Sequence, residues 1–139
     1  MKKWLIVGVI VLIIAIAGSV LFWIYLTADG ALKHETDRWA VIKDSHGDRI
    51  AIETTSDQIW NQLVELYQNQ SDRWIGSFVE EYDNKWGFRF KPENITIAEV
   101  TVEAAQATIK MISEDLNYWI GLDWIVYVLA TVTEIHTPS

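Results

Sequence analysis

The stretch WAVIKDSHGDRIAIE, residues 39–53, predicts the first part of a β-sheet. Residues 39–43 and 49–53 are mainly apolar or β-branched, and residues 44–48 between them include Asp, Ser, His and Gly. Two such runs around a glycine-containing turn are typical of a β-hairpin. We therefore expect the fold to begin with two paired strands.

After the hairpin, a helix and three further strands are predicted. Thr55 and Gln58 match the capping box that starts many helices, and apolar residues then recur at helical spacing to about Gln68. Within residues 86–90, large aromatic side chains alternate with small or polar ones, a period of two that predicts a strand. Strands are also expected at residues 73–81 and 95–102.

A second long helix and a last strand complete the pattern. Apolar residues from Ala105 to Trp119 step by four, three, four and three positions, which gives one continuous stripe, and Gly121 is suited to follow the helix. Residues 124–133 are apolar, β-branched and too few to span a membrane, as in a central strand. The order β-β-α-β-β-β-α-β predicts an α+β fold over residues 39–136, a mainly antiparallel sheet with two helices on one face.

Upstream of this domain, residues 4–28 contain no charged side chain. About 20 apolar residues cross a bilayer as a helix, so this stretch predicts a transmembrane signal-anchor in contact with lipid, followed by a tether at residues 29–38. Lys2 and Lys3 precede it, and the positive-inside rule then places the N-terminus in the cytoplasm. The prediction is a single-pass protein of the cell membrane with its domain outside.

A cleaved signal peptide is the alternative interpretation of the same segment. Ala15 and Ala17 form an A-x-A site after an apolar run. Cleavage there would leave a mature chain that starts on the very apolar run after Gly18, whereas cleavage regions are normally polar. An uncleaved anchor is therefore the favoured prediction.

The charge and cysteine content exclude several classes of function. The 139 residues carry a formal net charge of −8, and nine Lys and Arg face 19 Asp and Glu from residue 29 onward, a net of −10. Such an acidic domain argues against nucleic acid as a partner. The chain has no cysteine, so it has no disulfide, thiolate metal site or cysteine nucleophile.

One segment carries a resemblance to a known family. Asn84 precedes a Trp-x-Phe strand at Trp86, a turn at Pro92 follows, and Glu99, Glu103 and Ala107 lie in the next strand and helix. Over residues 49–134 this pattern resembles the N-terminal domain of the BP-seventy-four-like family, named for a cAMP-inducible protein. The resemblance implies an extracytoplasmic α+β module, and it carries no activity over to this chain. Ala105 and Gln106 stand where family members often have a Cys-Asp pair.

Carboxylates suggest two sites for a cation, although a group of charged residues more often forms a plain solvated surface. Ca²⁺ prefers oxygen ligands, and acidic residues flank the turn after residue 81 and the strand-to-helix segment near residue 100. The candidate ligands are Glu80, Glu81, Asp83, Glu99 and Glu103. The turn at residues 44–48, with its two Asp side chains, is a second candidate, although Asp, Ser and Gly also favour plain turns.

Aromatic residues suggest a binding surface, although aromatic side chains at a period of two, as in residues 86–90, more often belong to a core. Eight tryptophans are many for a chain of this size, so some of them are expected at the surface. The candidate binding residues are Asn84, Trp86, Arg89, Trp60 and Trp124. Asn69 and Asn94 begin N-x-[ST] sequons and are candidate glycosylation sites.

No catalytic motif points to an enzyme. The chain contains no G-x-S-x-G, G-x-G-x-x-G or H-E-x-x-H, and its three histidines are far apart in sequence. We therefore predict a membrane-anchored interaction domain without enzymatic activity and with a protein partner at the membrane surface. The alternatives are an accessory subunit of a membrane complex and a Ca²⁺-dependent adhesion module.

Overall fold

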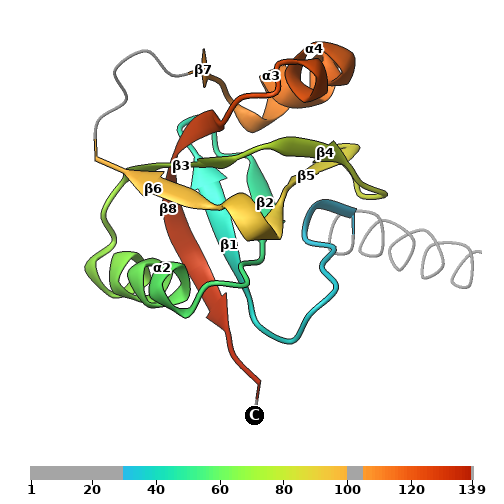
Figure 1. Ribbon diagram of the computed structural model, residues 1–139. Coiled ribbons are helices and arrows are strands. Elements are labelled where there is room, and N and C mark those ends of the chain that lie inside the picture. Colours follow the sequence, from blue (N-terminus) through green and yellow to red (C-terminus); the bar gives the residue numbers. More distant parts are fainter. Residues whose placement is uncertain (1–29, 100–104, 139) are drawn as a thin grey trace, which may run out of the picture. The chain divides into compact units, whose positions relative to one another are not determined.

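The computed structural model describes residues 30–99 and 105–138 (Figure 1). The predicted membrane segment at residues 4–28, with its A-x-A site, lies outside these ranges. Within them, no helix is both long enough and apolar enough to cross a bilayer. The α+β domain belongs to the second of two compact units, Ala31–Ser139.

The main sheet is antiparallel apart from one short pair, and its last strand lies at its centre. The strands follow the order β2-β1-β8-β3-β6, and β7 pairs parallel with the start of β8. Their bounds are β1 (Trp39–Asp44), β2 (Arg49–Ile52), β3 (Arg73–Ser77), β6 (Thr96–Ala98), β7 (Ala105–Gln106) and β8 (Val126–His136). The predicted hairpin is confirmed, with Lys43 opposite Arg49.

The predicted strand at residues 73–81 is wrong as a single element. It divides after Ser77, and β4 (Val79–Glu81) pairs with β5 (Phe88–Phe90) in a separate two-stranded sheet. At the division, the Ser77 hydroxyl donates to the Lys91 carbonyl over 2.8 Å and the Lys91 N–H donates to the Phe78 carbonyl over 2.9 Å. These bonds draw the chain away from the main sheet.

Helix α2 (Asp57–Asn69) lies where the sequence predicts it, but its cap is one residue later than expected. The Ser56 hydroxyl, not that of Thr55, accepts the Ile59 N–H over 3.2 Å. The inner face of α2 buries Trp60, Leu63 and Leu66. This face packs near β8, which alternates buried and half-buried residues from Val126 to Val132.

The predicted second long helix is wrong. Its first residues form β7, where the Ala107 N–H donates to the Tyr127 carbonyl over 3.0 Å. Thr108 then caps the short α3 (Ile109–Glu114), and the chain breaks at Asp115 (φ −144°, ψ 58°) before α4 (Leu116–Gly121). Gly121 is part of α4, and Leu122 follows as the C-cap. Three α-helices therefore stand in the described chain where two were predicted.

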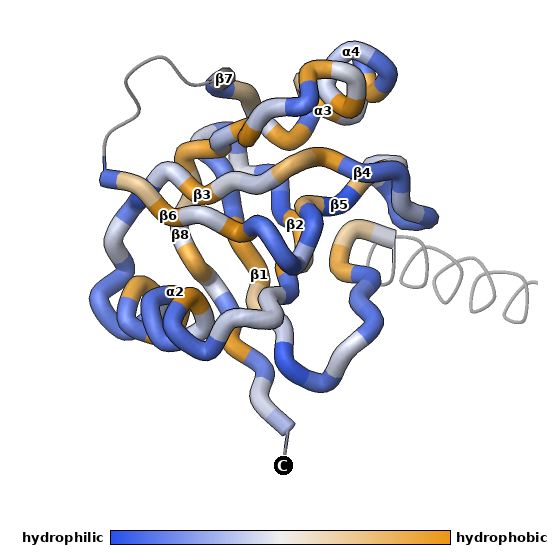
Figure 2. Tube along the Cα trace, viewed as in Figure 1, coloured by the Kyte–Doolittle hydropathy of each residue, from blue (hydrophilic) through white to orange (hydrophobic). Residues whose placement is uncertain are grey.

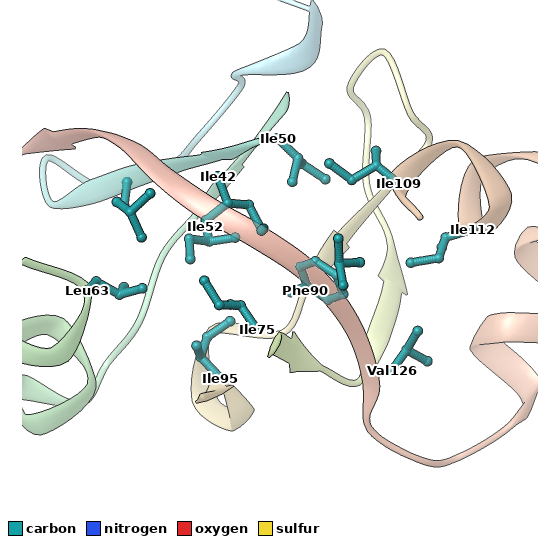
Figure 3. Close-up of a cluster of buried hydrophobic side chains, with 14 of the residues drawn as sticks. Ile42, Ile50, Ile52, Leu63, Ile75, Phe90, Ile95, Ile109, Ile112 and Val126 are labelled. Atoms are coloured by element: carbon teal, nitrogen blue, oxygen red, sulfur yellow. The ribbon is translucent and has the colours of Figure 1, made fainter. Parts of the chain in front are cut away.

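A single apolar core joins these elements. Figure 3 shows Leu63 of α2 toward one end of the cluster, Phe90 of β5 in its middle, and Ile109 and Ile112 of α3 toward the other. Burial of this much apolar surface is the main favourable term in folding. The short helix η1 (Pro92–Asn94) follows β5 and leads to buried Ile95.

Two buried carboxylates fasten loops to this core. Asp44 accepts three backbone N–H groups at 2.9–3.0 Å, from His46, Asp48 and Ile109. The oxygens of Asp44 are thus engaged by the backbone of the turn and of α3, and this explains the Asp-Ser-His-Gly-Asp pattern without a cation. Glu53 likewise accepts the N–H groups of Glu35 and Thr36, each over 2.9 Å, and the Thr36 hydroxyl.

Candidate functional site

The large apolar side chains that reach solvent are concentrated in one segment. In the described chain five such residues are exposed, and all but Tyr67 of α2 lie between residues 111 and 124. Tyr118 and Trp124 are the most exposed, at 54% and 61%. We name the four residues together the α4 surface: Met111, Tyr118, Ile120 and Trp124.

The break between α3 and α4 explains why this surface exists. Helices of six residues turn only part of their circumference toward the core, and α4 packs near β4 rather than over the main sheet. Trp119 links the exposed residues. Its Nε1 donates to the Met111 carbonyl over 3.2 Å, and the Tyr118 ring meets its ring edge-on at 5.0 Å. Along α3 and α4, Figure 2 shows hydrophobic residues interspersed with hydrophilic ones.

A pocket of about 280 Å³ adjoins the α4 surface. It lies between β4, the residue after β5, and the end of α4. Its lining combines aromatic, aliphatic and charged side chains: Phe78, Val79, Glu80, Glu81, Lys91, Trp119, Ile120, Asp123 and Trp124.

Some charged side chains of this pocket form ion pairs, and others do not. Glu80 accepts the Arg89 Nε–H over 2.6 Å, so its charge is largely balanced. Among the described residues, Glu81, Asp123 and the Lys91 ammonium have no ion-pair partner. Two unpaired carboxylates thus stand against one amine.

Asp123 also has an unusual backbone. Its φ is 52°, in the left-handed region that most non-glycine residues avoid. This turn carries the chain from α4 to Trp124. Aspartate and asparagine adopt this region more readily than most other residues.

Arg89 organises a second group of charges beside the pocket. Besides Glu80 it meets the Glu35 carboxylate at 3.3 Å, and its guanidinium lies 4.7 Å from the centre of the Tyr82 ring. The Tyr82 hydroxyl is buried without a hydrogen-bond partner in the described chain. Burial, and then the charges of Glu35 and Glu53, raise the pKa of Tyr82 above its ordinary value.

The candidate metal ligands do not gather into one group. Glu80 pairs with Arg89, Asp83 with Lys33 at 3.3 Å, and Glu99 with Arg73 at 3.9 Å. Glu103 lies outside the described residues. No three His, Asp or Glu side chains in the described ranges are placed to hold a metal ion. Ca²⁺ binding stays a prediction.

The candidate binding residues are separated by the fold. Trp124 is on the α4 surface, whereas Trp60 is buried in α2 beneath the Arg38 guanidinium, at 5.3 Å from its ring. The Asn84 side chain accepts the N–H groups of Trp86 and Gly87 and so builds the β4–β5 turn. The sequon residues Asn69 and Asn94 are both exposed, at the end of α2 and in η1.

Sequence analysis missed Met111, Tyr118 and Ile120. Met111 and Tyr118 fall between the members of the apolar stripe from Ala105 to Trp119, and Ile120 follows its last member; that offset was the available signal. It also missed that His34 and His136 both stack on Trp39, on opposite sides of its ring. Their ring centres lie 3.8 and 3.9 Å from that of Trp39. This stack needs the pairing of β1 with β8, which no local pattern indicates.

Comparison of the chain with protein-family models, with curated proteins and with solved structures gives no significant match. The resemblance to the BP-seventy-four-like family therefore stays a prediction.

Proposed function

We propose that this chain is a single-pass membrane protein that presents a non-enzymatic interaction domain outside the cytoplasm, and that the α4 surface binds its protein partner. The exposure of four large apolar side chains within 111–124 carries the proposal. Exposed apolar side chains in numbers often mark interaction sites, and tyrosine, tryptophan and methionine are enriched at the centres of protein interfaces.

The carboxylates of the neighbouring pocket favour a protein partner over an anionic membrane surface. The pocket beside the α4 surface carries two unpaired carboxylates, which negatively charged headgroups would repel. The membrane anchor predicted at residues 4–28 would hold the domain close to other membrane proteins. That arrangement raises the effective concentration of a partner, so even a small surface would suffice for binding.

Photo-crosslinking in intact cells tests this proposal. A photoreactive phenylalanine analogue replaces Tyr118 on the α4 surface and, in a matched control, Tyr67 of α2, which is 40% exposed. We expect a discrete crosslinked protein from position 118 and none from position 67. Equal crosslinking at both positions, or none at 118, would contradict the proposal.

Protease added outside the same cells tests the orientation. Digestion of the domain is expected. Complete protection in intact cells, with digestion after lysis, would show the domain on the cytoplasmic side.

A further inference from the structure

We infer that the pocket between β4 and α4 takes a lysine or arginine side chain from a segment of the partner protein. This inference rests on the proposed function and names the chemistry of the partner. It starts from the composition of the pocket, which pairs an aromatic and aliphatic wall with free carboxylates.

The carboxylates define the charge of the occupant. Glu81 and Asp123 have no cationic partner among the described residues, and the Lys91 ammonium pairs with neither. A guanidinium or ammonium in the pocket would form charge-assisted hydrogen bonds with a carboxylate of its lining, and such bonds are roughly twice as strong as neutral ones. An anionic occupant would instead meet an acidic domain of net charge −10 from residue 29 onward.

The apolar wall defines the rest of the occupant. Trp119, Ile120 and Trp124 line the pocket, and Trp124 is 61% exposed. Lysine and arginine carry aliphatic stems that pack along such walls while their charged ends reach polar groups. Tryptophan faces attract cations more strongly than other rings do. Apolar neighbours of that cation in the partner segment would cover Met111 and Tyr118 on the adjoining α4 surface.

The pocket is also large enough for one such side chain. Its volume is about 280 Å³, close to the lower end of the range for small-ligand sites, about 300 Å³. The pocket combines carboxylates with an apolar wall, and the α4 surface beside it is apolar. Together they match a basic, partly apolar segment of a partner rather than a large free ligand.

The first test uses the full-length protein in detergent micelles and two peptide probes. One probe is a fluorescein-labelled hexapeptide of alternating leucine and arginine; the other has glutamine in place of arginine. We expect fluorescence anisotropy to detect binding of the arginine peptide and at least about tenfold weaker binding of the glutamine peptide. Equal affinity for the two probes would overturn the inference.

Matched variants then place the binding. The double variant E81Q/D123N removes both free carboxylates from the pocket and keeps the side-chain shapes; asparagine also tolerates the left-handed backbone at 123. The control E65Q/E93Q removes two exposed carboxylates outside it. We expect about a tenfold loss of affinity in the first variant and less than about twofold in the second. Equal losses would show nonspecific attraction to an acidic protein and overturn the inference.

Two further outcomes separate the inference from the proposed function. Crosslinking at position 118 that persists unchanged in E81Q/D123N, together with no binding of the arginine peptide, would overturn the cationic pocket and leave the interaction domain standing. Binding of phosphocholine, but not of the peptide, with loss in E81Q/D123N would identify a lipid headgroup as the occupant and overturn the assignment to a protein segment.

Discussion

Helix α2 and the α3–α4 pair have similar sequence patterns, but they bury their apolar side chains to different extents. Both regions have apolar residues at helical spacing. Helix α2 runs for 13 residues and buries Trp60, Leu63 and Leu66. Helices α3 and α4 have six residues each and leave three large apolar side chains exposed, and Trp124 after α4 is exposed as well. The apolar face of α2 is buried in the core, whereas several large apolar side chains of α3–α4 are exposed.

The difference shows that the continuity of a helix decides how its apolar residues are used. One uninterrupted helix keeps a single stripe facing the core over its whole length. The chain breaks at Asp115 between α3 and α4, so no single helix carries the apolar stripe through this region. The exposed side chains of the α4 surface thus lie on and after two short helices, not along one continuous helix.

The largest effect on the free energy of unfolding should appear in a pair of truncations, one in α2 and one in α4. Leu63→Ala removes a fully buried side chain from α2 and should lower the free energy of unfolding by about 2–5 kcal/mol. Ile120→Ala on the α4 surface should change it by less than about 0.5 kcal/mol. Urea denaturation of the full-length protein, followed by circular dichroism, measures both values. A loss of several kcal/mol at Ile120 would mean that the α4 surface is part of the core.

The next largest effect should arise at Asp44, which attaches α3 to the hairpin. Asp44→Ala leaves three N–H groups without their acceptor and should cost about 2–3 kcal/mol. Hydrogen exchange at the Ile109 amide should accelerate with it. Asp44→Asn keeps one carbonyl oxygen and should cost less. If the alanine variant unfolds at the wild-type urea concentration, this carboxylate does not hold α3 in place.

A smaller effect of opposite sign is expected at Asp123. Glycine adopts a φ of 52° without a steric penalty, so Asp123→Gly should raise the free energy of unfolding by about 0.5–1 kcal/mol. The same variant should bind the arginine peptide more weakly, because one free carboxylate is lost. Asp123→Ala is the control, since it loses the carboxylate but keeps the strained backbone. An unstable glycine variant would show that the Asp123 side chain itself stabilises the turn.

The smallest effect is expected at Tyr82, away from both helical regions. Its hydroxyl is buried without a partner in the described chain, so Tyr82→Phe should change stability by less than about 0.5 kcal/mol at pH 7. Above pH 10 the two proteins should differ. Burial and nearby carboxylates raise the pKa of Tyr82 in the folded state above the ordinary 10.0, so the unfolded chain ionises first and stability falls as pH rises past that value.

The alkaline fall should therefore be shallower in Tyr82→Phe than in the wild-type protein. Melting temperatures measured from pH 8 to 11 compare the two slopes. Parallel slopes would place the alkaline loss of stability at other groups.

Local patterns were enough to predict the hairpin and α2. The hairpin needs only a turn between two β-rich runs, and α2 needs only a cap and a periodic stripe. The second long helix was wrong because a competing interaction is non-local: Ala107 pairs with Tyr127, twenty residues along the chain. The strand at residues 73–81 divided for a similar reason, since Ser77 bonds to the Lys91 carbonyl.

The candidate site was predictable only in part. Trp124 was a candidate because a small domain has limited room for eight tryptophans. The pocket beside it joins Glu81 of β4 to Asp123 after α4, and no spacing in the sequence relates these two positions. The break at Asp115, which exposes Tyr118 and Ile120, follows from tertiary packing rather than from a proline or glycine at that residue.

The hydrogen bonds of Glu53 have a mechanical consequence. They fasten Glu35 and Thr36 to the end of β2, ahead of the first strand of the domain. A force applied to the chain before residue 35 would load these three bonds before it reached the pairing of β1 with β2 and β8. The hydrogen bonds of Glu53 would thus bear the force before the strand pairs do. Glu53→Gln should therefore lower the rupture force of the domain when it is pulled from its N-terminal side.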